Sequence, residues 1–305
     1  MLKTPALLMG DPAYFSVVGG ANPHTRDRWG RRKRVDRALA IRQWRGLHDL
    51  LSEFGFRIHV IPPDPALPGL VYPANAGVRI GSDFILSNLI ATRAAERDVY
   101  ARIVEAAGLR CRTIARRFEG EADLFPAGGH YLYTSGELRD QRFQFRFGFP
   151  PWKRVYGFRS EPAAIDEISR LFPPGPTLRL KLVDEQFYHG DTCLCSYGPH
   201  REFLLAWLPA LSPESRLLLA NVYAKNLTAL EESDAMLYAA NSFAFSRDDK
   251  FYLVLPKGAS RQLVRSLRDN GISILTVDVS EFLRKGGGSV KCMIGDLGIL
   301  PESAP

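Results

Sequence analysis

A thiol near the end of the sequence has the surroundings of a nucleophile. Cys292 closes the segment Gly-Gly-Gly-Ser-Val-Lys-Cys at residues 286–292. A glycine run lets the backbone approach a ligand closely and presents the thiol at the end of a loop. A single cysteine is more often a buried packing residue, and a nucleophilic one also needs a base and a group that orients this base. Such partners usually lie far away in the sequence.

The strongest candidate for the base is a histidine that shares a short segment with an acid. His189 and Asp191 lie two residues apart in Tyr-His-Gly-Asp, so on an extended segment both side chains face the same side. They can then act on one ligand, with the imidazole as general acid and base. Of the six histidines, His24 is the second choice, because it also lies in a turn-rich segment.

Three carboxylates crowd beside a glycine in the segment Phe-Glu-Gly-Glu-Ala-Asp, which holds Glu119, Glu121 and Asp123. An exposed acidic loop is the simplest interpretation. The functional interpretation is a buried acid that pairs with His189 and a second acid for a cationic substrate. Several other polar segments also combine a Gly or Pro with an ionisable or amide side chain, which is typical of loops that carry the site of an enzyme.

These segments must be positioned by alternating strands and helices. Short β-rich apolar runs predict strands, and apolar residues at helical spacing predict helices. Strands are expected at 6–9, 57–61, 84–87, 131–134, 178–182, 251–255 and 273–277, and helices at 35–54, 91–107, 163–171 and 259–270. The expected fold class is therefore α/β. No long linker divides the chain and no internal repeat is evident, so we expect a single domain over residues 1–305.

The composition is that of a soluble globular protein. Of 305 residues, 46% are hydrophobic and 24% are charged, and no apolar stretch approaches the ~18 residues needed to cross a membrane. No signal-peptide cleavage site is apparent, so a cytoplasmic location is expected. Four cysteines are too few for a disulfide scaffold and are expected to be reduced. Cys193 and Cys195 would share one face of a strand and are interpreted as packing residues.

The net charge of +7 raises the question of a nucleic-acid partner. Seven of the twelve residues at 26–37 are Lys or Arg, but no helix-turn-helix, zinc-finger or RNA-recognition pattern accompanies them. A solvated helix face is the commoner role of such a run. Neither a nucleic acid nor a membrane is therefore expected as a partner, whereas a homo-oligomer stays open.

Taken in order, the polar segments resemble those of the guanidino-group-modifying superfamily, the enzymes with the pentein fold. The likeness runs from Asp-Pro-Ala-Tyr-Phe (11–15) through Phe-Glu-Gly-x-x-Asp (118–123) and His-x-Asp-Thr-Cys (189–193) to the highly specific glycine-rich segment at 286–292. The superfamily includes amidinotransferases, arginine deiminases, dimethylarginine hydrolases and arginine dihydrolases. The resemblance implies its fold, an α/β propeller of five ββαβ modules in a pseudo-fivefold ring around a central active site.

The resemblance also implies roles for the matching catalytic residues. Cys292 would be the nucleophile and His189 the general acid and base. Glu119 would be the carboxylate partner of His189, and Asp191 would bind the guanidinium nitrogens. Asp123 is expected to contact the substrate as a further acid.

Two arginines match positions that hold the α-carboxylate of the substrate in such enzymes. Arg159 lies in Gly-Phe-Arg-Ser, and Arg93 lies in a Ser-Asn…Arg-x-x-Glu segment. A bidentate guanidinium suits this task. Solvated surface arginines are the simpler interpretation for both.

Two departures from the superfamily pattern bear on the substrate. Deiminases and dimethylarginine hydrolases carry an acid where this chain has Asn75, and an Asp that commonly precedes this segment is missing from residues 69–72. Because an amide is neutral, ureido groups fit as ligands beside guanidinium groups. Asn22 and Asn75 would then contact the terminal group of the substrate, which agrees with two successive hydrolyses.

The resulting hypothesis is a cysteine-dependent hydrolase of arginine or an arginine-like guanidino compound, which releases ammonia through a covalent thiouronium intermediate. Within this hypothesis, an arginine dihydrolase is slightly preferred over a deiminase or a dimethylargininase. The alternatives are an amidinotransferase, which passes the amidino group to an amine acceptor, and a noncatalytic binding protein on the same scaffold. No metal cluster, nucleotide-binding loop or flavin motif is visible, so no cofactor is expected, and the expected partner is a small guanidino substrate.

Overall fold

The strands form small sheets that share one pattern. The structure is a computed structural model and describes residues 3–145, 147–149, 151–171 and 175–301. Within these residues there are five three-stranded sheets and a two-stranded one. In each three-stranded sheet the central strand pairs with one neighbour antiparallel and with the other parallel. The expected α/β class is confirmed, and the topology repeats although the sequence shows no repeat.

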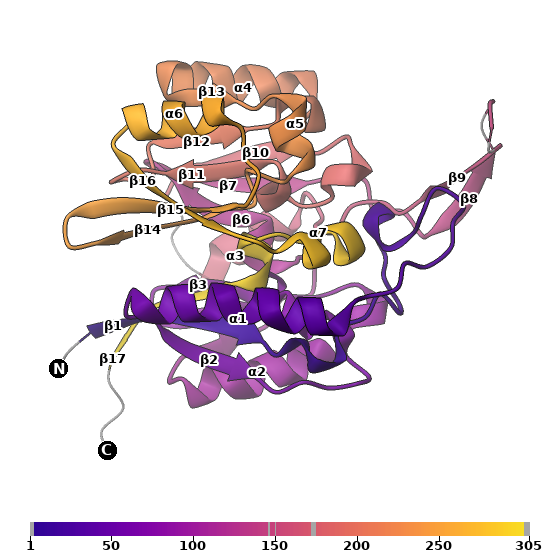
Figure 1. Ribbon diagram of the computed structural model, residues 1–305, viewed down its shortest axis with the longest axis horizontal. Helices are drawn as coiled ribbons and strands as arrows, with labels where there is room; N and C mark the ends of the chain where they lie inside the picture. Colours follow the sequence, from indigo (N-terminus) through magenta and orange to yellow (C-terminus); the bar gives the residue numbers. More distant parts are fainter. Residues whose placement is uncertain (1–2, 146, 150, 172–174, 302–305) are drawn as a thin grey trace.

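Each three-stranded sheet combines an antiparallel outer strand, a central strand and a parallel outer strand. In that order, the sheets are β17 (Gly295–Pro301), β1 (Lys3–Gly10) and β2 (Arg57–Ile61); β3 (Gly77–Ile80), β4 (Asp83–Leu86) and β5 (Arg110–Arg112); β6 (Leu124–Ala127), β7 (His130–Ser135) and β10 (Thr177–Lys181); β11 (Leu194–Tyr197), β12 (Phe203–Ala206) and β13 (Leu227–Ala229); and β14 (Phe243–Arg247), β15 (Lys250–Pro256) and β16 (Ile272–Val277). In the first sheet β17 pairs with β1, so strands from opposite ends of the sequence lie side by side (Figure 1).

A helix lies in the crossover between the central strand and its parallel neighbour in every three-stranded sheet, because parallel strands need a long connection. The crossover helices are α1 (Arg37–Glu53), α2 (Glu96–Ala106), α3 (Ala164–Leu171), α4 (Pro213–Tyr223) and α6 (Arg261–Asp269), whereas α5 (Glu232–Met236) and α7 (Ser280–Gly286) connect sheets. At the start of α1, the side chain of Asp36 accepts a hydrogen bond from the backbone N–H of Leu39 at 3.0 Å, an N-cap. The same helix buries Leu47 and Leu51 in one core with Leu7 of β1.

Short 3-10 turns precede the first strand of four sheets. They are η4 (Pro73–Asn75) before β3, η6 (Gly120–Ala122) before β6, η8 (Gly190–Thr192) before β11 and η11 (Lys291–Met293) before β17. Turn η4 contacts both η6 and η11, and η6 contacts η8. The repeated topology thus brings together turns that are far apart in the sequence.

Glycine is required where two of these turns meet. Gly120 has a φ of +71°, and a Cβ on it would lie 2.6 Å from the carbonyl oxygen of Ala74 and 2.8 Å from that of Gly77. Any other residue would be strained at this φ and would push η6 away from η4.

Two exposed segments are features of the surface. The strands β8 (Arg142–Phe145) and β9 (Trp152–Val155) form a hairpin that projects from the rest of the molecule (Figure 1), with Phe143, Phe145 and Trp152 exposed. The basic segment at 26–37 is also largely exposed, as expected for a solvated face.

Two further expectations concern the core and membranes. Cys193 and Cys195 are buried in the largest hydrophobic core and are free thiols, which confirms their interpretation as packing residues. In the described part of the chain, no helix has the length and apolar character to cross a membrane.

Candidate active site

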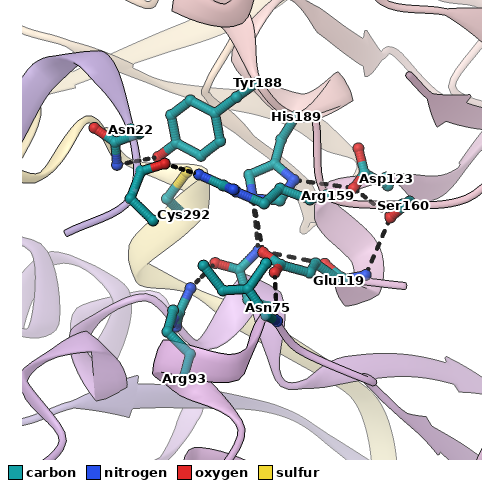
Figure 2. A network of polar contacts seen from close by, with 12 residues as sticks. Asn22, Asn75, Arg93, Glu119, Asp123, Arg159, Ser160, Tyr188, His189 and Cys292 are labelled. Atoms are coloured by element: carbon teal, nitrogen blue, oxygen red, sulfur yellow. Dashed lines mark hydrogen bonds and ion pairs between the residues drawn. The ribbon is translucent and has the colours of Figure 1, made fainter. Parts of the chain in front are cut away.

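Five segments, one belonging to each three-stranded sheet, meet at one place. Each contributes a residue that stands just before the first strand of its sheet: Asn75, Glu119, His189, Asn241 and Cys292. Four of them are drawn in Figure 2, where their side chains gather around one space. In each three-stranded sheet, the residue just before the first strand therefore contributes a polar side chain or thiol to the site.

The thiol of Cys292 is held by an amide that sequence reasoning missed. Sγ accepts a hydrogen bond from Nδ2 of Asn241 at 3.2 Å and donates one to Oδ2 of Asp191 at 3.5 Å. Oδ1 of Asn241 accepts from the backbone N–H groups of Cys292 and Ser289, at 3.1 and 3.0 Å. Asn241 thus fixes both the thiol and the loop that carries it. Its sequence surroundings contain no turn signal, and its place before a first strand becomes visible only in the structure.

The imidazole of His189 lies between two carboxylates. Nδ1 is 2.9 Å from Oδ2 of Asp123, and Nε2 is 3.2 Å from Oε2 of Glu119. Burial disfavours the charged ring, but the two carboxylates outweigh burial and raise the pKa of His189 to about 9. The ring is therefore an imidazolium at neutral pH.

Asp123 lies behind this ring and does not face a ligand. Its Oδ1 accepts hydrogen bonds from Oγ1 of Thr134 at 2.6 Å and from the backbone N–H of Gly190 at 3.0 Å. Its Oδ2 accepts from Oγ of Ser160 at 2.6 Å as well as from His189. An ionised carboxylate has about four acceptor positions, so none is left for a substrate. The expected substrate contact of Asp123 is corrected accordingly: its geometry is that of a group that orients the imidazole.

Glu119 stands on the other side of the ring and lines the cavity. Its Oε1 accepts from the backbone N–H of Ile90 at 3.1 Å, while Oε2 faces His189. Burial favours the neutral acid, but His189, Arg159 and Arg93 outweigh burial and lower the pKa of Glu119 to about 2. The carboxylate is therefore charged at neutral pH.

Arg93 orients the amide of Asn75. Nη1 of Arg93 donates to Oδ1 of Asn75 at 2.7 Å, so Nδ2 of Asn75 donates to the carbonyl oxygen of Glu119 at 3.3 Å and also lies 3.3 Å from Nε2 of His189. Arg93 is itself held by an ion pair with Glu96, at 2.7 Å. The sequence predicts that Asn75 and Arg93 contact the substrate. Both residues line the cavity.

Asn22 and Arg159 gather around the ring of Tyr188. Nδ2 of Asn22 donates to the hydroxyl of Tyr188 at 3.3 Å and to the carbonyl oxygen of Gly286 at 2.8 Å. The guanidinium carbon of Arg159 lies 5.3 Å from the centre of the Tyr188 ring, and Nη2 donates to the carbonyl oxygen of Ala21. The hydrogen bond between Asn22 and Tyr188 can be followed in Figure 2, and both Asn22 and Arg159 line the cavity.

Asp191 lies beside the thiol and is incompletely paired. Its Oδ1 is buried and has no hydrogen-bond partner among the described residues. Burial raises the pKa of Asp191 to about 6. Burial and the neighbouring Asp191 also raise the pKa of the Cys292 thiol well above its usual value.

The cavity itself has a volume of about 520 Å³. Among the residues that the sequence singled out, those that line it are Asn22, Asn75, Arg93, Glu119, Arg159, His189 and Cys292. His24 does not reach this group, because its Nε2 contacts the hydroxyl of Tyr238 at 2.7 Å. Glu121 also points elsewhere and forms an ion pair with Lys291 at 2.7 Å. Within the described residues, no group of His, Cys, Asp or Glu is arranged to hold a metal ion.

A curated relative covers nearly the whole chain. The N(G),N(G)-dimethylarginine dimethylaminohydrolase of Mycobacterium tuberculosis is 30% identical over 292 residues, which are 95% of this chain and 85% of that protein. The chain belongs to the pentein superfamily of guanidino-modifying enzymes. No model of a protein family matches the sequence.

Other pentein relatives combine this unit with a further part. The bifunctional arginine dihydrolase/ornithine cyclodeaminase AgrE of Nostoc is 29% identical over 291 residues, or 94% of this chain, and the chain spans 37% of its length. Among solved structures, the N-terminal domain of ArgZ, in a variant covalently bound to a reaction intermediate, superposes with a TM-score of 0.80 at 25% identity and covers 96% of this chain and 97% of that one.

Proposed function

We propose that this protein hydrolyses arginine or an arginine-like guanidino compound by way of a covalent adduct on Cys292, with release of ammonia. Membership of the pentein superfamily supports the reaction class. The observation that carries the proposal is that Cys292, His189 and Glu119, which are far apart in the sequence, line one cavity. The names of the relatives, an arginine dihydrolase and a dimethylarginine hydrolase, support guanidino substrates.

Two carboxylates are assigned to the guanidinium group: Glu119 on the cavity wall, and Asp191, which contacts the thiol of Cys292 but is not among the residues that line the cavity. Glu119 is ionised and lines the cavity, and the buried Oδ1 of Asp191 lacks a hydrogen-bond donor among the described residues. A guanidinium keeps its charge at all relevant pH values and carries several N–H donors. Its N–H groups would supply the donor that Asp191 lacks, and its charge beside the sulfur would favour the thiolate of Cys292.

The first half of the reaction forms the adduct. As the guanidinium binds, the thiol of Cys292 loses its proton to solvent, and the thiolate Sγ adds to the guanidinium carbon, so that a C–S bond forms and the carbon becomes tetrahedral. His189, an imidazolium at neutral pH, donates its proton to the leaving nitrogen. The C–N bond breaks, ammonia leaves, and a thiouronium group remains on the sulfur.

The second half of the reaction releases the product. The now neutral His189 takes a proton from a water molecule, whose oxygen adds to the same carbon. The C–S bond then breaks, the sulfur leaves as a thiolate, and the hydroxyl group of the adduct releases its proton to solvent, which leaves a neutral ureido compound. Asp123 and Glu119 keep the ring in place and stabilise its charged form in both halves.

A second round on the ureido product agrees with the neutral side chains at the cavity. The side chains of Asn22 and Asn75 at the cavity wall carry no charge, which suits an uncharged ureido group. We therefore propose an arginine dihydrolase as the first candidate activity, before a deiminase or a dimethylargininase.

We also propose that the five sheets form one pentein propeller within a single domain over residues 1–305. Contacts between neighbouring sheets support this arrangement: β17 with β3, β3 with η6, β6 with β11, and β11 with β14. The hydrogen bond between Asn241, before β14, and Cys292, before β17, would close the ring.

The test is product analysis with matched cysteine variants. Purified protein is incubated with a panel of guanidino compounds, and the products and ammonia are identified by mass spectrometry and a coupled assay. Cys292→Ser is expected to lose at least about a thousandfold in rate, whereas Cys111→Ser, which alters a thiol outside the cavity, keeps the wild-type rate. Turnover only with an added amine acceptor would indicate an amidinotransferase instead, and binding without any turnover would indicate a binding protein.

A further inference from the structure

The outer part of the cavity differs from the part that holds the thiol. Away from Cys292 the wall is formed largely by apolar residues and glycines, among them Val17, Val18, Gly19 and Leu67. A ligand whose guanidinium reaches Cys292 would extend its other end along this wall. The polar groups present there therefore select the rest of the substrate.

The charges around the cavity are unbalanced. Among its described lining residues, apart from the titratable His189, three carry a guanidinium, namely Arg37, Arg93 and Arg159, and two carry a carboxylate, namely Glu96 and Glu119. His189 adds a further positive charge at neutral pH. A ligand that brings its own carboxylate gains from this excess, and a ligand that brings a second cation loses.

Neither carboxylate is free to bind an ammonium group. Glu119 pairs with His189, at 3.2 Å, and its remaining acceptor positions are assigned to the guanidinium end of the ligand. Glu96 accepts from Nε and Nη2 of Arg93 and from the hydroxyl of Tyr100 at 3.1 Å. An α-ammonium group would therefore meet no available carboxylate among the described residues that line the cavity.

The cavity wall has no room for a further carboxylate at Gly69. In the segment 69–72 the structure packs Glu96 directly against Gly69: a Cβ on Gly69 would lie 2.2 Å from Oε1 of Glu96 and 2.8 Å from Nε of Arg93. No side chain fits there while this ion pair stands.

Arg37 is the guanidinium of the cavity with the most N–H groups left for a ligand, ahead of Arg159, which donates one of its five. Nε, Nη1 and Nη2 of Arg93 already donate to Glu96, Asn75 and the carbonyl oxygen of Gly69, which leaves one of its five N–H groups. Arg159 lies against Tyr188 and donates to Ala21. Arg37, by contrast, is exposed and forms no hydrogen bond or ion pair with any residue that the structure describes.

From these contacts we infer that the preferred substrate is a guanidino carboxylate without a free ammonium group, and that Arg37 binds its carboxylate. This inference rests on the proposed hydrolysis and narrows its substrate class. Two kinds of compound share the required chemistry: a simple ω-guanidino acid, and arginine with an acylated α-amine.

The deciding comparison uses compounds that differ in one group. 5-Guanidinopentanoate is arginine without its α-ammonium group, agmatine is arginine without its carboxylate, and Nα-acetylarginine keeps the carboxylate but masks the ammonium. The wild-type kcat/KM for 5-guanidinopentanoate or Nα-acetylarginine is expected to exceed that for arginine at least about tenfold, with agmatine the poorest. The compound with the higher kcat/KM, 5-guanidinopentanoate or Nα-acetylarginine, shows whether the substrate is a simple ω-guanidino acid or an acylated arginine. A highest kcat/KM for arginine or agmatine would overturn the inference.

Variants of two neighbouring arginines test the role of Arg37. Arg37→Ala is expected to raise KM for the preferred carboxylate about tenfold with little change in kcat, and to leave KM for propylguanidine, which has no carboxylate, unchanged. Arg34→Ala is the matched control, because Arg34 is exposed on the same segment but does not line the cavity. Equal KM values for Arg37→Ala and wild type would refute the assignment.

The two proposals fail in different ways. If no compound of the series is hydrolysed, the proposed function fails, and calorimetric titration of the same compounds then decides the ligand class by itself. If 5-guanidinopentanoate or Nα-acetylarginine binds more tightly than arginine and agmatine, the inferred ligand class stands without the reaction. If arginine binds more tightly than both, the inferred ligand class is rejected.

Discussion

The reactivity of the thiol depends on one neighbouring amide. Burial and Asp191 raise the pKa of Cys292, and the hydrogen bond from Asn241 is the largest influence that opposes them. The same amide accepts the backbone N–H groups of residues 289 and 292. Asn241 is therefore a positioning residue that acts on the nucleophile and on its loop together.

Replacing this amide by an isosteric apolar group should make the thiol less reactive. In Asn241→Leu the thiolate loses its donor, so the pKa of Cys292 rises further, and kcat/KM falls roughly tenfold to a hundredfold, the worth of a hydrogen bond to a charged group. Alkylation of the Cys292 peptide by iodoacetamide, followed by mass spectrometry across pH, should be slower than in wild type at every pH below the pKa. The loss of the two backbone partners should also lower Tm.

Asn270→Leu provides the control for this variant. Asn270 donates to the hydroxyl of Tyr197 at 3.0 Å, outside the cavity, so its replacement costs stability without changing the alkylation profile. Superimposable profiles for Asn241→Leu and wild type would contradict the assigned role.

At the residue scale, sequence reasoning reached the groups that lie in short segments of unusual composition. Cys292, His189 and Glu119 stand in glycine-containing segments, and all three line the cavity. Spacing could not tell which acids of the segment 118–123 face the ring. The turn η6 directs Glu119 and Asp123 to His189 and sends Glu121 to Lys291, and this outcome depends on backbone angles that the residue types do not determine.

At the scale of elements, the site depends on how closely neighbouring turns approach. Gly120 combines a positive φ with a contact that excludes a Cβ. Gly81 has a similar φ of +61°, but a Cβ on it would meet no atom within 4 Å. Comparing a substitution at Gly81 with the same substitution at Gly120 therefore separates the cost of backbone strain from the cost of close packing.

Alanine at these two positions should have different costs. Gly81→Ala is expected to lower the free energy of unfolding by about 1 kcal/mol, the cost of a left-handed alanine. Gly120→Ala should cost several kcal/mol, because η6 must also move away from η4, and kcat should fall as Glu119 moves. Urea unfolding and kinetics measure both effects. Equal losses of stability in the two variants would show that the contact with Ala74 is unimportant.

The elements that could be predicted are those with a regular apolar pattern. All seven expected strands and four expected helices have counterparts, such as the strand at 57–61, which is β2, and the helix at 35–54, which contains α1. The fourth sheet, β11 to β13, and its helix α4 were not expected. Strand β11 is buried throughout and follows a site turn directly, β13 has three residues, and in α4 the adjacent leucines 217–219 hide the helical period.

At the scale of the whole molecule, the site is formed by equivalent positions in the five three-stranded sheets. Every three-stranded sheet begins after a turn or short segment that supplies one polar residue, and the pairing of β17 with β1 brings the last such segment, with Cys292, to the first sheet. Repeats of this kind share topology but little sequence, because each core position needs only an apolar residue of suitable size. Sequence similarity within the chain therefore does not reveal the five three-stranded sheets, and the resemblance to the superfamily was the basis for expecting repeated modules.

The buried imidazolium should make the stability of the whole protein depend on pH. The pKa of His189 is about 9 in the folded state against 6.5 as its ordinary value. A raised pKa means that the folded state binds the proton more tightly, so this contribution is fully present below pH 6.5 and is lost as the pH rises through 9. The difference of about 2.5 pKa units corresponds to at most about 3 kcal/mol.

Asp123→Asn isolates this contribution, because it removes the negative charge at Nδ1 and lets the pKa of His189 fall. Urea unfolding at intervals from about pH 6 to 9.5, which brackets the shift, should show wild type losing more stability than Asp123→Asn over this range, while the other titrating groups cancel in the difference. Asp166→Asn, which alters an exposed carboxylate paired with Arg179, should follow the wild-type curve. A difference between wild type and Asp123→Asn that does not change with pH would mean that the imidazole is neutral in the folded protein, and the proton donor of the first half-reaction would then have to be another group.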